Sequence, residues 1–148
     1  MTDGERGISR RRWMGQAYCV LFGLACGSAA TALAVLINAV GDYQTSADNV
    51  RMWLPSLVGV VLGWIFAGRA LRQPALHTAC RLLGGLVTIV CLGSAGYFFV
   101  RQVTSTGWDQ IELFVMTLLS LIGAAMGAIT AACGFIGRRY LTADAKRD

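Results

Sequence analysis

The chain has 148 residues, of which 55% are hydrophobic and only 14% are charged. In soluble domains roughly a quarter of all residues are charged, so this composition argues against a soluble globular protein. The net charge of +5 does not indicate nucleic-acid binding, because the charges lie in short clusters between long apolar runs. We interpret the positive balance as a determinant of membrane topology and of attraction to lipid headgroups.

Four apolar runs follow one another along the chain. A helix needs about 20 apolar residues to cross a bilayer. We therefore predict an all-α integral membrane protein with four transmembrane spans, at about residues 13–40, 52–68, 82–100 and 113–137. Residues 1–12 are predicted to be a cytoplasmic basic tail, and residues 138–148 a second cytoplasmic tail.

The basic residues predict the orientation of these spans. Of the 13 Lys and Arg residues, 11 fall in the two tails and in the predicted middle loop, residues 69–81. Only Arg51 and Arg101 fall in the other two loops. By the positive-inside rule both termini are cytoplasmic, and we expect a multi-pass protein of the bacterial cytoplasmic (inner) membrane. The predicted topology anchors are Arg10, Arg11, Arg12, Arg69, Arg72, Arg138 and Arg139.

The first span has an alternative interpretation as a cleaved export signal. Ser9-Arg10-Arg11-Arg12 before an apolar run resembles a twin-arginine signal. The uncharged run extends to Val40, however, whereas the apolar region of a signal has about 7–15 residues. Cleavage would also leave an odd number of spans, so we expect the first helix to be retained.

One stretch of the sequence occurs twice. Residues 52–67 return as residues 116–131, with 8 of 16 positions identical. Both copies run in the same direction through the membrane in the predicted topology. This pattern predicts a duplicated two-helix hairpin packed as a bundle, with convergence of two Gly-rich helices as the alternative.

Pairs of glycines four residues apart occur in three of the predicted spans. Such pairs lie on one face of a helix and let a neighbouring backbone approach closely. The contact is either internal to one four-helix bundle or part of an oligomer or pore. The predicted helix-packing residues are Gly23, Gly27, Ser56, Gly59, Gly63, Ser120, Gly123 and Gly127.

The spans contain no charged residue and no histidine. Ion-coupled transporters usually keep an ionisable group at membrane depth, so the sequence does not favour one. His77 and Cys80 lie three residues apart in the predicted middle loop, but two ligands do not complete a metal site. We predict that the five cysteines are small apolar helix residues. We expect no catalytic, cofactor or metal site and no enzymatic activity.

These observations predict a non-enzymatic integral membrane subunit that packs through small-residue helix faces. The expected assembly is a homo- or hetero-oligomeric membrane complex, such as a secretion, conjugation or transport component. The alternative is a small oligomeric pore-forming or holin-like membrane protein. The expected partners are membrane lipid and either a second copy or another membrane protein, with no nucleic acid.

Overall fold

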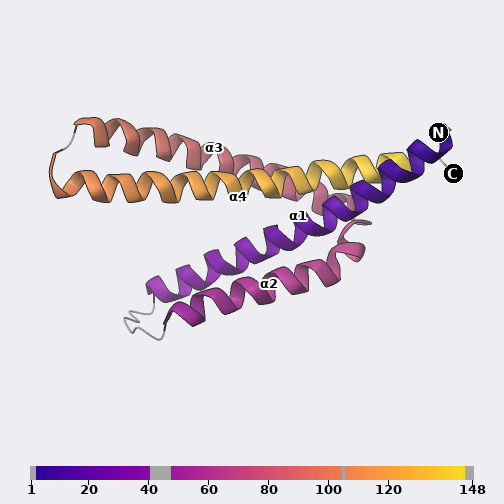
Figure 1. Ribbon diagram of the computed structural model, residues 1–148, viewed down its shortest axis with the longest axis horizontal. Helices are drawn as coiled ribbons and strands as arrows, with labels where there is room; N and C mark the ends of the chain where they lie inside the picture. The colour runs from indigo at the N-terminus through magenta and orange to yellow at the C-terminus, as the bar shows by residue number, and fades with distance from the viewer. Residues whose placement is uncertain (1–2, 41–47, 105, 146–148) are drawn as a thin grey trace.

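The computed structural model describes the backbone of residues 3–40, 48–104 and 106–145, and the side chains of residues 7–37, 54–104 and 106–145. Over these ranges the protein is all-helical, as the sequence predicted (Figure 1). The four helices are α1 (Asp3–Val40), α2 (Asp48–Ala70), α3 (Pro74–Thr104) and α4 (Trp108–Asp144).

The first and last helices of the chain, α1 and α4, are longer than a bilayer requires. α1 has 38 residues and α4 has 37, so each extends about 55 Å at 1.5 Å per residue. The hydrocarbon core is about 30 Å thick. Most of the two segments that the sequence suggested were tails is helical, since α1 begins at Asp3 and α4 ends at Asp144.

The chain between α2 and α3 is much shorter than the predicted loop 69–81. Only Leu71–Gln73 leave the helices, and the Gln73 N–H donates to the carbonyl of Ala70 at 3.0 Å. Pro74 then begins α3. Proline favours the first position of a helix because its missing N–H would have no intrahelical partner there. Residues 74–81, including His77 and Cys80, are consequently helical, and the sequence prediction was wrong here.

Three helical segments are long and apolar enough to cross a membrane: Gly7–Ile37, Pro74–Thr104 and Trp108–Asp144. The described apolar part of α2, Leu54–Ala70, is shorter. Only 11% of each long apolar window is buried inside the protein, and Ile89, for example, is 72% exposed. Apolar surface on this scale fits a lipid environment and would be a liability in water.

The helices form two antiparallel hairpins, α1–α2 and α3–α4, which also touch each other through α1 and α4. Figure 1 shows the hairpins meeting at the end that carries both termini and the α2–α3 turn, and diverging toward the other end. The buried core lies where they meet and comprises Tyr18, Ala67, Ala70, Leu71 and Cys133. The two copies of the sequence repeat are in α2 and α4, the second helix of each hairpin.

Candidate interaction sites

The glycine pairs of α1 and α2 face each other. A Cβ atom built on Gly59 would lie 2.8 Å from the Cys26 carbonyl oxygen and 3.1 Å from the Cα of Gly27. One built on Gly63 would lie 3.0 Å from the Cα of Gly23. Only glycine fits such backbone contacts, so the small faces of these two helices are occupied within their own hairpin.

A polar pair strengthens the same contact. The hydroxyl groups of Thr31 on α1 and Ser56 on α2 hydrogen-bond to each other. The Thr31 hydroxyl also lies 2.9 Å from the carbonyl oxygen of Gly27, to which it donates. Hydrogen bonds of this kind between membrane helices contribute about 0.6–2 kcal/mol. Ser56 thus lies in the contact between α1 and α2.

The second hairpin is packed in a similar way, with different partners. A Cβ on Gly127 would lie 2.8 Å from the backbone nitrogen of Thr88 and 2.9 Å from the Gly84 carbonyl oxygen. A Cβ on Gly123 would lie 2.9 Å from the sulfur of Cys91. Ser120 is half-buried and makes no hydrogen bond to a described residue. The closest helix contact of this hairpin is therefore displaced from Ser120 toward the basic end of the molecule.

A buried cluster around His77 was not anticipated from the sequence. His77 is only 1% exposed, its Nε2 lies 3.0 Å from the carbonyl oxygen of Leu71, and its ring meets that of Tyr18 edge-on, with centroids 5.3 Å apart. Because a carbonyl only accepts, Nε2 carries the proton. Nδ1 has no hydrogen-bond partner in the part of the chain that the structure describes.

Two glycines of α4 make room for this cluster. A Cβ on Gly134 would lie 2.5 Å from the His77 carbonyl oxygen, and one on Gly137 would collide with the His77 ring. The sequence signal was present, since glycines at 127, 134 and 137 follow a helical spacing. It could have been found by continuing the glycine face of α4 beyond the repeat.

The structure does not assemble a metal site from His77 and Cys80. Among the described residues no group of three His, Cys, Asp or Glu side chains is placed to hold a metal ion. All five cysteines lie in described segments and are free thiols.

Two grooves flank the place where α1 passes α4, at the point from which the hairpins diverge. One has a volume of about 440 Å³ and is lined from α1, α2 and α4. The other has a volume of about 320 Å³ and is lined from α1, α3 and α4. Ser28 and Met126 line both grooves. Most of the lining consists of small or aliphatic side chains, so the grooves suit an apolar occupant.

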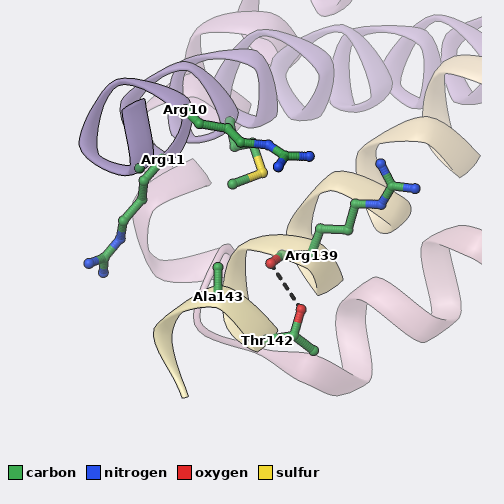
Figure 2. Close-up of a pocket in the computed structure, with 7 residues that line it drawn as sticks. Arg10, Arg11, Arg139, Thr142 and Ala143 are labelled. Atoms are coloured by element: carbon green, nitrogen blue, oxygen red, sulfur yellow. Dashed lines mark hydrogen bonds between the residues drawn. The ribbon is translucent and has the colours of Figure 1, made fainter. Parts of the chain in front are cut away.

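A basic cavity of about 400 Å³ lies between the first turns of α1 and the last turns of α4 (Figure 2). Its lining residues are Gly7, Arg10, Arg11, Met14, Arg139, Thr142 and Ala143. All the predicted topology anchors belong to the end of the molecule that holds this cavity or to the α2–α3 region at the same end.

One arginine of this cavity is already paired. The Arg11 guanidinium forms an ion pair with Asp144 and lies 5.2 Å from the centre of the Tyr140 ring. Both contacts join the start of α1 to the end of α4. Arg11 therefore holds the two walls of the cavity together.

No protein-family model, curated protein or solved structure matches the chain.

Proposed function

We propose that the chain is a non-enzymatic subunit of the bacterial cytoplasmic membrane, with four spans and both termini in the cytoplasm. In this proposal it assembles into a homo- or hetero-oligomeric membrane complex of the kind used in secretion, conjugation or transport. The observation that carries the proposal is the pair of grooves between the hairpins, which the protein's own helices do not fill.

The chemistry of the grooves favours another helix as their occupant. Their walls include Ala25, Ser28, Ala29 and Ala32 of α1, which are all small. Small residues let a neighbouring helix backbone come close and make dispersion contacts that lipid chains match poorly. The Ser28 hydroxyl already donates to the carbonyl oxygen of Ala25 at 2.9 Å, so its hydrogen atom needs no acceptor from a partner helix.

The surface proposed for assembly overlaps only in part with the one that the sequence suggested, since Gly27, Ser56, Gly123 and Gly127 line the grooves. The glycine pairs of α1 and α2 are in contact with each other. Assembly through the grooves uses α1 and α4 where the hairpins diverge, and Gly27 and Ser56 of the α1–α2 contact lie at the wall of one groove. We take a second copy of the chain as the first partner to test, because most oligomers are built from identical subunits.

The four-span arrangement draws support from the distribution of charge. The start of α1, the segment from the end of α2 to the start of α3, and the end of α4 lie at one end of the molecule (Figure 1). The described part of these segments carries 9 of the 13 basic residues. Cytoplasmic loops carry such an excess of Lys and Arg. α2 has 23 residues, and a crossing needs about 20, so the length of α2 is compatible with the proposed fourth span.

The lining of the grooves gives less support to the pore alternative. A water-filled path needs polar groups along its wall, and the grooves offer only the hydroxyls of Ser28, Thr31, Ser56 and Thr130. The hydroxyls of Thr31 and Thr130 already donate to carbonyl oxygens of their own helices.

Site-specific photo-crosslinking tests the proposal in membranes. A benzophenone amino acid replaces Met126, which lines both grooves, and in a matched variant it replaces Ile89, which is 72% exposed on α3. We expect position 126 to give a product of twice the chain mass and position 89 to give lipid adducts only. Lipid adducts alone from both positions would contradict assembly through the grooves.

A further inference from the structure

The basic cavity holds two arginines whose charges are not neutralised by any residue in the part of the chain that the structure describes. Arg10 comes from α1 and Arg139 from α4, and both line the cavity. Neither forms an ion pair with a described residue, whereas Arg11 is paired with Asp144. Figure 2 shows Arg10 and Arg139 extending into the same gap between the helices, while Arg11 points away from it.

The remaining polar groups of the cavity do not offset this charge. The Thr142 hydroxyl lies 3.0 Å from the Arg139 carbonyl oxygen, to which it donates, and the dashed line in Figure 2 marks this bond. None of the described residues that line the cavity is an Asp or a Glu. Two guanidinium groups at one opening therefore dominate its potential, and a guanidinium matches the oxygens of a phosphate group with paired hydrogen bonds.

The cavity also lies at a defined depth. Arg10 is three residues before Trp13, where the uncharged run of α1 begins, and Arg139 is next but one to Gly137, where the apolar run of α4 ends. Both positions therefore lie within one turn of helix of the apolar runs. Trp13 is 64% exposed, as expected for an aromatic side chain at a headgroup layer. Met14 gives the cavity an apolar wall on the membrane side.

We infer that this cavity binds the phosphate group of an anionic phospholipid of the cytoplasmic leaflet, through Arg10 and Arg139. The ion pair of Arg11 with Asp144 sets the spacing of the two helices around the lipid headgroup. The bound lipid would thus join the first and last helices of the chain at the membrane surface. This inference rests on the proposed membrane placement, with the basic end on the cytoplasmic side.

The test uses the full chain in lipid nanodiscs that contain a trace of spin-labelled lipid. The immobilised fraction of labelled phosphatidylglycerol is compared with that of labelled phosphatidylcholine. The test variant is Arg10→Gln with Arg139→Gln. The matched control is Arg12→Gln with Arg138→Gln, which removes the same charge from exposed neighbours that do not line the cavity.

We expect the unaltered chain to prefer phosphatidylglycerol over phosphatidylcholine. In the test variant this preference should fall roughly tenfold, because two charge-assisted contacts are removed. The control should lose about threefold or less through the weaker general field. Equal losses in the two variants would overturn the site, as would the absence of a preference in the unaltered chain. Far-UV circular dichroism shows whether both variants keep their helix content.

Two further measurements separate the possible failures. Displacement of labelled phosphatidylglycerol by inorganic phosphate would assign the cavity to soluble phosphate and overturn the lipid assignment. Alkaline carbonate extraction of membranes reports insertion independently of lipid preference. A chain that resists extraction but shows no anionic preference refutes this inference alone, whereas an extracted chain refutes the proposed function as well.

Discussion

At the scale of single residues, the structure depends most on places where a glycine adjoins a large buried group. Gly137 is the clearest example, because a Cβ there would collide with the His77 ring and lie 2.8 Å from Cε2 of Tyr18. His77 in turn holds the α2–α3 turn through its bond to the Leu71 carbonyl oxygen. The junction of the two hairpins is therefore sensitive to one added methyl group.

We predict that Gly137→Ala lowers the free energy of unfolding by about 1–3 kcal/mol, as overpacking of a core commonly does. The control is Gly85→Ala, where an added Cβ meets nothing within 4 Å and helix propensity gains up to about 1 kcal/mol. Unfolding in detergent, followed by circular dichroism, measures both. Because the clash is with His77, Gly137→Ala should cost less in a His77→Ala background. An identical cost in both backgrounds would show that the His77 ring is not the obstacle.

At the scale of helices, the two hairpins are held by direct backbone contact. The pairs Gly23 and Gly27 on α1 and Gly59 and Gly63 on α2 leave no room for side chains between them. Gly93 and Gly96 on α3 are different, because an added Cβ there meets nothing within 4 Å. Glycine is thus required for helix contact at positions 59 and 63, whereas at positions 93 and 96 no contact within the described chain requires it.

We predict that Gly59→Leu together with Gly63→Leu separates α1 from α2 and lowers the thermal midpoint, whereas Gly93→Leu together with Gly96→Leu has little effect. Each large side chain at the contact costs about 1–3 kcal/mol. Because the contact is within one chain, the loss should not vary with protein concentration in detergent. A loss that disappears at high protein concentration would instead indicate a contact between subunits.

Particular residues show how much of this could be read from the sequence. The helices and the grouping of basic residues followed from the apolar runs and from the positions of Arg10 to Arg12, Arg138 and Arg139, since these are properties of each helix alone. The Gly59–Gly63 pattern indicated close backbone contact but could not identify the partner helix. His77 was placed in the predicted loop 69–81 because Arg69, Arg72 and Arg81 separate two uncharged runs, whereas α3 already begins at Pro74. The divergence of the hairpins was not predictable from the sequence. An apolar helix face can be covered by lipid chains or by another helix, and the sequence pattern is the same in both cases.

At the scale of the whole molecule, the number of crossings decides where the C-terminus lies. With four spans, the N-terminus, the α2–α3 turn and the C-terminus share the side that the positive-inside rule makes cytoplasmic. If α2 did not cross, α1, α3 and α4 would make three crossings, and the C-terminus would be on the outer side. The described apolar part of α2 is the shortest of the four, so this helix is the one to test.

We predict that a fluorescent-protein fusion after Asp148 is fluorescent and that an alkaline phosphatase fusion at the same place is inactive, since each reporter works on only one side of the membrane. Phosphatase fused after Thr104, at the far end of α3, should be active. Fused after Gln73, in the α2–α3 turn, it should be inactive, because 11 basic residues hold that side inward. An active phosphatase after Asp148 would mean an odd number of crossings. It would also place Arg139 on the outer side of the membrane, away from the cytoplasmic leaflet. That result would contradict the lipid site proposed between Arg10 and Arg139.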